Sequence, residues 1–180
     1  DLEIIAMELI LADLQSVTSQ LEKVRKIARG LDRDAAADVA VLERLESHLD
    51  AGNPARTLDG DDEVQERLKR FFLLSSKPLL FACNIDEGEL PDAPGSDLVS
   101  NVTEYARTCE GSEVTVVSAK FEAELCDLPN EDRVEFLEAS GLEEPGSERL
   151  IRKAFDLLRL GTFFTNNETE ARAWPYPRGT

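Results

Sequence analysis

The sequence has few of the residues that build metal sites and disulfide frameworks. Its 180 residues include three cysteines, one histidine, one methionine and one tryptophan. Cys83, Cys109 and Cys126 are odd in number and have no CxxC spacing, so neither a zinc site nor a disulfide framework fits them. His48 alone cannot form a metal site. We interpret the cysteines as small buried residues of a protein kept in a reducing compartment, the cytoplasm.

Long apolar runs are also missing, although apolar residues make up 42% of the chain and suffice for a core. The apolar stretch near the start, residues 4–7, is interrupted by Glu8, and no stretch is long enough to span a bilayer. No basic segment leads into an apolar one, as a signal peptide requires. The first residue is aspartate rather than methionine, as we expect of a piece of a longer chain.

Positive charge is scarce, since the net charge is −17. Phosphate contacts need lysine and arginine, so the bulk surface is not expected to bind nucleic acid. One basic cluster stands apart within eleven residues: Lys23, Arg25, Lys26, Arg29 and Arg33. It is a candidate contact for RNA, although such a cluster on a helix is more often a solvated face.

The first part of the chain has the periodicity of paired helices. Apolar residues recur at spacings of three and four from Met7 to Ala28, which predicts a helix with a coiled-coil seam. Asp32 or Asp34 suits the N-cap of a second helix over 35–49. The short connection predicts an antiparallel hairpin with the basic cluster at its tip. A third helix is expected over 62–74.

The pattern then changes to that of an α/β fold. Residues 79–83 form a short apolar run, typical of a strand buried on both faces, and residues 114–117 form another. A helix is expected between them, over 96–109, so the three elements predict a parallel βαβ unit. Further helices are expected over 129–139 and 146–160, and a strand begins at 171–174. Trp174 is expected to pack in a core or between domains.

Polar residues follow both strands of this unit, where ligands bind in open parallel sheets. Residues 84–87 supply Asn84, Ile85 and Glu87, and residues 118–120 supply Ser118, Ala119 and Lys120. An asparagine offers a donor and an acceptor to a purine edge, backbone amides can donate to the ring, and an ionised Glu87 only accepts. Ile85 and the stem of Lys120 are expected to sandwich a flat base. Each signal alone is weak, because Asn84 could be a turn residue and Ser118 a helix N-cap.

In their order, these motifs resemble those of the YchF subfamily of Obg-like P-loop NTPases. Small GTPases carry Asn-Lys-x-Asp and then Ser-Ala-Lys, whereas this chain has Asn-Ile-Asp-Glu at 84–87, and Asn-x-x-Glu marks the YchF subfamily. Four other segments agree: Glu8–Leu14, Leu142–Gly146, Thr162–Thr165 and Arg172–Trp174.

The resemblance implies a fold, an activity and partners. The fold is the C-terminal part of a Rossmann-like P-loop NTPase sheet with an antiparallel coiled-coil insert. The insert would cover residues 1–74, the G-domain part 75–165, and the start of a TGS domain 166–180. The activity is hydrolysis of ATP in preference to GTP, with Mg²⁺, and the partners are the ribosome or RNA. No membrane partner is expected. Asn84 and Glu87 would contact the base, and residues 118–120 would complete its pocket.

One departure limits what this chain can do. It has no G-x-x-x-x-G-K-[ST] phosphate loop, and Asp59–Asp62 is a helix cap rather than a magnesium-binding motif. Catalysis by phosphate positioning is therefore not expected of this chain by itself, nor tight binding of nucleotide. Two alternatives stay open: a non-catalytic helical module that binds RNA, the ribosome or a protein, and a purely structural scaffold.

Overall fold

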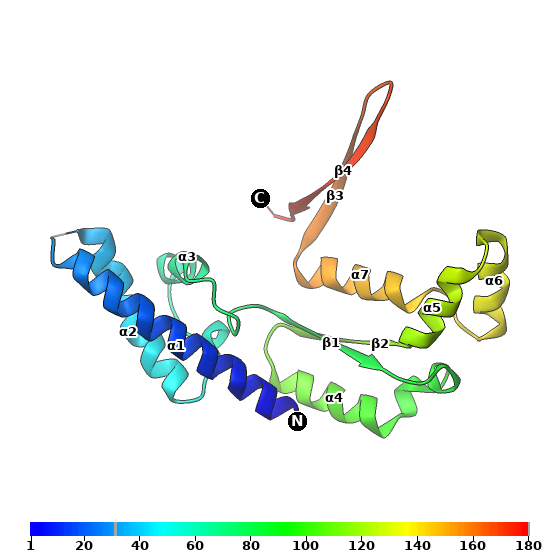
Figure 1. Ribbon diagram of the computed structural model, residues 1–180, viewed down its shortest axis with the longest axis horizontal. Coiled ribbons are helices and arrows are strands. Elements are labelled where there is room, and N and C mark those ends of the chain that lie inside the picture. The colour runs from blue at the N-terminus through cyan, green and yellow to red at the C-terminus, as the bar shows by residue number, and fades with distance from the viewer. Residues whose placement is uncertain (31, 180) are drawn as a thin grey trace. The chain divides into compact units, whose positions relative to one another are not determined.

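The computed structural model describes residues 1–30 and 32–179, and the chain forms two compact units, Asp1–Lys77 and Pro78–Thr180 (Figure 1). Leu31, within the segment predicted as the helical insert, and Thr180, the last residue of the predicted TGS start, lie outside the described residues. Each unit has a hydrophobic core of its own. No described helix is both long and apolar enough to cross a membrane.

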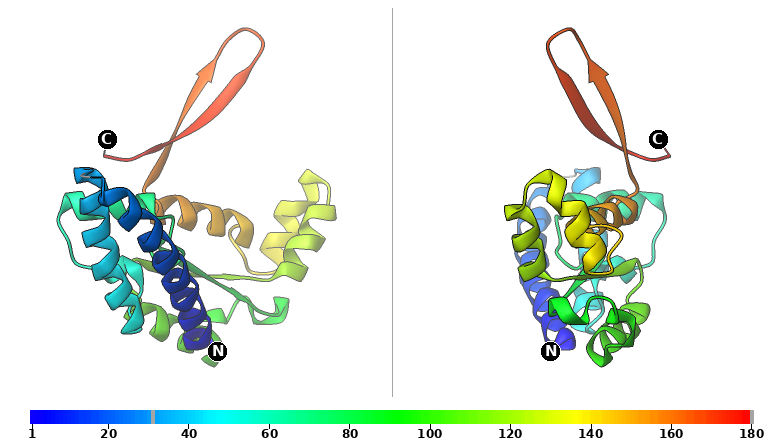
Figure 2. Two further views of the ribbon diagram at one scale, coloured as in Figure 1. Left: turned by 60° about the vertical axis from the view of Figure 1, so that its left-hand side comes forward. Right: turned by 90° about the vertical axis from the view of Figure 1, so that its right-hand side faces the viewer.

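The first unit is helical, and its two long helices lie side by side and antiparallel (Figures 1 and 2). Its elements are α1 (Leu2–Ala28), α2 (Arg33–Asp50), the short 3₁₀ helix η1 (Ala55–Thr57) and α3 (Asp62–Arg70). Between α1 and α2 the core contains Val17, Leu21, Leu42, Leu45 and Leu49, each 1% exposed or less. Full burial of such a side chain contributes about 1.5–3 kcal/mol.

Two details of the predicted hairpin are resolved by the structure. Asp32 is the N-cap of α2, because its Oδ1 accepts from the amides of Asp34 and Ala35 at 2.9 and 3.1 Å. The predicted seam begins too early, since Met7 is 46% exposed and burial starts at Ile10. Because α2 ends at Asp50, Met7 has no turn of α2 opposite it to pack against.

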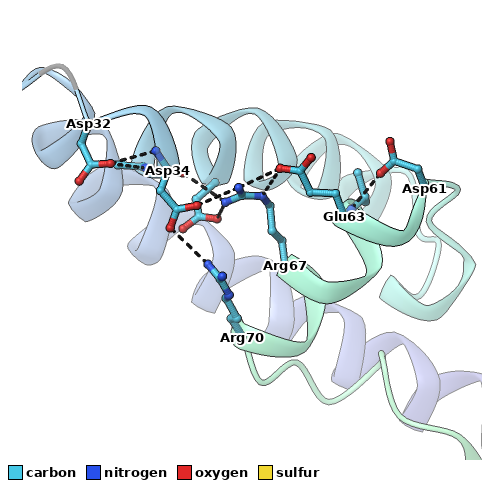
Figure 3. A network of polar contacts seen from close by, with 9 residues as sticks. Asp32, Asp34, Asp61, Glu63, Arg67 and Arg70 are labelled. Carbon is cyan, nitrogen blue, oxygen red and sulfur yellow. Dashed lines mark hydrogen bonds and ion pairs between the residues drawn. The ribbon is translucent and has the colours of Figure 1, made fainter. Parts of the chain in front are cut away.

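Arg67 holds α3 against the start of α2 (Figure 3). Its guanidinium is hydrogen-bonded to the carboxylates of Asp34, Asp38 and Glu63 and to the backbone oxygen of Asp34. Arg67 is 9% exposed, and its three carboxylate partners raise the pKa of its guanidinium. Arg70 adds a longer contact of 3.4 Å to Asp34. A guanidinium buried to this degree is stable only with such partners, so the network fixes where α3 docks.

A buried carboxylate on α1 decides where α3 ends. Asp13 is 2% exposed and accepts from the amides of Leu74 and Ser75 and from the Ser75 hydroxyl, at 2.6–2.8 Å. The Ser75 hydroxyl in turn accepts from the amide of Ala55 at 2.9 Å. Phe72 has a left-handed backbone with φ 53°. The prediction that the third helix continues to residue 74 is therefore wrong, because these amides bind Asp13 instead of a helical carbonyl.

The second unit contains the predicted βαβ arrangement. β1 (Leu79–Asn84) pairs parallel with β2 (Ser112–Val117), with the register Leu79 to Ser112 and Asn84 to Val117. Between them lie η2 (Glu87–Glu89), η3 (Ala93–Gly95) and α4 (Asp97–Thr108), and after them come α5 (Ala119–Asp127), α6 (Asn130–Ala139) and α7 (Gly146–Leu157). Both α4 and α7 contact the sheet.

Burial of the strands is less complete than predicted. Cys83 is 5% exposed, but Ala82 and Asn84 in the same strand are exposed. The prediction of a strand buried on both faces is wrong here, because each strand has only one partner within the described residues. The cysteine prediction holds for Cys83, whose burial raises the pKa of its thiol, and fails for the half-buried Cys109 and the exposed Cys126.

The last described residues form a two-stranded ribbon that projects beyond α7 (Figures 1 and 2). β3 (Leu160–Asn166) pairs antiparallel with β4 (Ala171–Pro177). The left-handed Arg159, φ 52°, ends α7 at Leu157, short of the predicted residue 160. Trp174 is 43% exposed and donates to Thr165 Oγ1, so among the described residues it does not occupy a core. The domain boundary predicted between residues 165 and 166 falls inside β3.

Candidate functional site

The carboxyl ends of β1 and β2 meet and bring the two predicted loops together. Asn84 is paired with Val117 at the last position of the sheet. One residue further, the amide of Ile85 donates to the carbonyl of Val117 at 3.0 Å. This is the edge of a parallel sheet at which ligands bind, so the structure brings the chemistry of residues 84–87 beside that of residues 118–120.

Asn84 links the two loops directly. Its Oδ1 accepts a hydrogen bond from the amide of Ala119, the first residue of α5, at 2.9 Å. This uses the acceptor of the side chain, and the amide nitrogen Nδ2 keeps its two donors. Asn84 itself is exposed, so these donors face the outside of the sheet edge.

Lys120 and Glu87 form an ion pair across the same edge. The Nζ of Lys120 lies 3.3 Å from Glu87 Oε1 and 3.8 Å from Glu124 Oε1. The hydrogen bond and charge of Glu87, followed by the charge of Glu124, raise the pKa of Lys120. Lys120 is therefore fully charged near neutral pH. Both partners are well exposed, and the pair contributes more to local geometry than to stability.

A hollow of about 410 Å³ lies between these loops and the start of α4. Its volume is within the range of small-molecule sites, about 300–1,000 Å³. Six of its eight lining residues belong to the polar types that recognise a ligand or cap a helix; the full lining is Asn84, Ile85, Asp86, Glu89, Ser96, Leu98, Ser118 and Lys120.

The structure limits the expected role of Ile85. It is 9% exposed and packs in the core of the second unit, so it presents only a small part of its surface to the hollow, and the sandwich of a base between Ile85 and Lys120 stays a prediction. Leu98 lines the same hollow and is 60% exposed. Ser118 occupies the N-cap position of α5 without capping it through its hydroxyl, and it is 2% exposed.

Sequence reasoning missed four residues of this hollow. Asp86 belongs to the first motif, but no role was predicted for it. Glu89 lies in the loop after that motif, and Ser96 and Leu98 lie at the start of the next helix, where no motif was recognised. Ser96 is the first residue of the predicted helix, and in the structure it is the N-cap of α4. The approach of Leu98 and Glu89 to Lys120 depends on the two 3₁₀ turns η2 and η3, which the sequence pattern did not indicate.

The basic cluster lies around the connection between α1 and α2. Lys23, Arg25, Lys26, Arg29 and Arg33 are all exposed. Arg25 is paired with Glu43 of α2 at 2.8 Å, so part of its charge is neutralised within the hairpin. Among the described residues, no three histidine, cysteine or acidic side chains are grouped to hold a metal ion.

Comparison with known proteins identifies relatives of the chain. No protein-family model matches the chain. The chain is 39% identical over 179 residues to the ribosome-binding ATPase YchF of Bacillus subtilis, and 38% identical over 179 residues to that of Escherichia coli O157:H7. These matches cover 99% of the chain and 49% and 48% of the relatives, so the chain spans about half their length.

A solved structure gives the same result for the fold. The YchF GTPase of Schizosaccharomyces pombe superposes with a TM-score of 0.82 at 24% identity, covering 100% of this chain and 49% of that one. The α/β fold with its small parallel sheet is therefore that of a YchF protein. Over nearly its whole length, this chain is homologous to about half of the YchF ribosome-binding ATPases.

Proposed function

We propose that the chain supplies the base-recognition loops of a nucleotide-hydrolysing protein. The contact between Asn84 and Ala119 carries this proposal, because it joins two loops that follow neighbouring parallel strands at a ligand-binding edge. The hollow beside it has the size of a small-molecule site. The relatives that match the chain are described as ribosome-binding ATPases, which supports the same activity for a longer protein containing it.

Polar groups at this sheet edge favour a purine: Asn84 lines the hollow, and Glu87 is paired with Lys120, which also lines it. Asn84 Nδ2 can donate to the N7 acceptor that adenine and guanine share. Glu87 is an acceptor when ionised and matches an exocyclic amino group, as adenine has at its N6 position. Both purines carry an exocyclic amino group, so the preference follows the relatives, which are described as ATPases, and we propose ATP as the preferred nucleotide.

We assign no residue of this chain to the binding of phosphate. The proposed base-recognition loops offer polar groups to a purine, but the sequence contains no G-x-x-x-x-G-K-[ST] motif to hold phosphates. We therefore assign no residue of this chain to Mg²⁺ and no step of hydrolysis to it. Positioning the base is the contribution we propose for residues 84–87 and 118–120.

Titration with ATP and GTP tests the proposal. The chain should bind ATP weakly and more tightly than GTP, and Asn84→Asp should reduce the affinity for both nucleotides. Asn101→Asp, the same substitution at an exposed residue of α4 that does not line the hollow, serves as the matched control. Binding that is unaffected by Asn84→Asp would contradict the assignment.

A second proposal concerns the helical hairpin, which we take to be the coiled-coil insert of the longer cytoplasmic protein. Its exposed basic tip is a suitable contact for ribosomal RNA within an otherwise acidic chain. Reversing Lys23, Lys26 and Arg29 to glutamate should weaken ribosome co-sedimentation, more strongly at low salt. Reversing three exposed cations outside the hairpin, Lys77, Arg152 and Arg178, is the control with the same change in charge. Unchanged sedimentation of the tip variant would leave the hairpin as a scaffold.

A further inference from the structure

A second and larger hollow lies along β2, on the edge of the strand that does not face β1. It has a volume of about 830 Å³, and β2, α4, α7 and the loop before α4 line it. It has no lining residue in common with the nucleotide hollow. Its position beside an open strand edge makes the backbone of β2 accessible to a partner.

The register identifies which backbone groups face this hollow. The carbonyl of Val117 bonds to β1, and in a parallel pair alternate residues direct both backbone groups to the neighbouring strand. Glu113 and Thr115 therefore also face β1. The N–H and C=O groups of Val114 and Val116 point outward, and no strand within the described residues pairs with them.

Two cationic side chains of α7 donate hydrogen bonds to the outward carbonyls. Arg149 Nη2 donates to the carbonyl of Val116 at 2.8 Å, and Lys153 Nζ donates to that of Val114 at 2.6 Å. Lys153 also lies 3.5 Å from Glu113. The outward amides of Val114 and Val116 have no hydrogen-bond partner in the described part of the chain. The two outward carbonyls are thus bonded to side chains rather than to a strand, and the two outward amides are unused.

We propose that the outer edge of β2 binds an extended acidic peptide, which adds a strand to the sheet. The amides of the peptide replace Arg149 and Lys153 at the two carbonyls, and its own carbonyls accept from Val114 and Val116. The released guanidinium and ammonium groups then pair with carboxylates of the peptide. A neutral or basic peptide cannot compensate these cations, so the displacement selects for acidic sequences.

Charge and shape of the lining support this partner. Three cations line the hollow, Arg107, Arg149 and Lys153, against one carboxylate, Glu113, although the whole chain has a net charge of −17. Apolar side chains from both covering layers, including Val99, Ala106 and Leu142, can receive every second side chain of an extended peptide. The buried Thr115 Oγ1 in the same lining lacks a hydrogen-bond partner among the described residues.

Fluorescence anisotropy with two labelled peptides tests the proposal on the whole chain. One peptide alternates glutamate with valine, and the other alternates lysine with valine at equal length. The acidic peptide should bind at least about tenfold more tightly than the basic one, and it should slow hydrogen exchange at the amides of Val114 and Val116. Equal binding of both peptides, or no binding of the acidic one, would overturn the proposal.

Two variants separate strand addition from simpler explanations. Arg149→Gln with Lys153→Gln should weaken the acidic peptide by about tenfold; stronger binding or self-association would show that the cations only guard the edge. Val114→Pro removes an outward amide, which an edge strand tolerates, and should also abolish binding. Full binding by this variant would mean that charge alone attracts the peptide. Unchanged thermal unfolding of the variants establishes that the fold is intact.

Discussion

Asn84 and Ala119 are 35 residues apart in the chain, yet the side-chain oxygen of one accepts from the amide of the other at 2.9 Å. The two polar atoms of the Asn84 side chain therefore have different functions. Oδ1 holds the start of α5 next to the end of β1, and Nδ2 is left to donate to a ligand. Loop positioning and base recognition therefore depend on the same side chain and can be separated by substitution.

The substitution Asn84→Asp should separate loop positioning from base recognition. Aspartate keeps an acceptor for the Ala119 amide but has no donor for a purine nitrogen. We expect the fold and the slow exchange of the Ala119 amide to be retained, while the affinity for ATP falls by about tenfold, the effect of one lost hydrogen bond of roughly 1.4 kcal/mol.

Asn84→Ala is the companion variant. It loses both functions, so ATP binding should fall and the exchange of the Ala119 amide should also accelerate. If Asn84→Asp binds ATP as well as the original chain does, Nδ2 has no part in recognition, and the role of Asn84 is only structural.

The pKa of Lys120 should respond to its neighbours in a fixed order. Glu87 is the larger cause of the raised pKa and Glu124 the smaller, so Glu87→Gln should lower the Lys120 pKa more than Glu124→Gln does. Titration of the Nζ signal by NMR measures both shifts. A larger decrease with Glu124→Gln would place Lys120 against α5 rather than across the hollow.

Much of this site was predictable because it depends on residues that follow strands. The apolar runs at 79–83 and 114–117 predicted the parallel pair, and the sheet then required Asn84 and Ser118 to be close. The burial of Ile85 follows the alternation of β1, in which Cys83 is buried and Asn84 is exposed, and the expected base contact of Ile85 did not take that alternation into account. The early end of α3 was not predictable, because Asp13, 62 residues away, captures the amide of Ser75.

Asp13 should be important for the stability of the first unit. Asp13→Asn retains the size of the side chain but can place an NH₂ group against the donors of Leu74 and Ser75. We expect a loss of about 1–3 kcal/mol in the free energy of unfolding, the cost of a buried unsatisfied group. Glu8→Gln, an exposed change on the same helix, should stay within about 0.5 kcal/mol. Urea titration followed by circular dichroism measures both, and equal effects would contradict a special role of Asp13.

Asp34 should make the stability of the first unit sensitive to acid. The hydrogen bond and charge of Arg67 hold the pKa of Asp34 below its ordinary value of 3.8. A carboxyl group with a lowered folded-state pKa stabilises above its ordinary pKa, and the contribution is lost as the pH falls through the lowered value. The excess stability over Asp34→Asn should therefore be constant from about pH 5 to 7 and shrink below about pH 4. An excess that persists to pH 2 would show that the charge of Asp34 is not involved.

Hydrolysis is not expected of this chain. Without a phosphate loop, a bound nucleotide lacks the groups that stabilise the transferred phosphoryl. Phosphate release from ATP should equal that of a buffer blank, for the original chain and for Asn84→Ala alike. Turnover above the blank that survives Asn84→Ala would require a catalytic site elsewhere in the chain.

Mapping of ATP on the chain by ¹⁵N–¹H NMR is the most direct test of base recognition. The account predicts that millimolar ATP shifts the amide signals of residues 84–87 and 118–120, and that adenosine, which lacks phosphates, shifts the same signals. It also predicts that Asn84→Asp suppresses these shifts while the remaining spectrum is preserved. Shifts confined to other residues, or no shifts from either compound in the folded chain, would contradict the assignment of this sheet edge to the base.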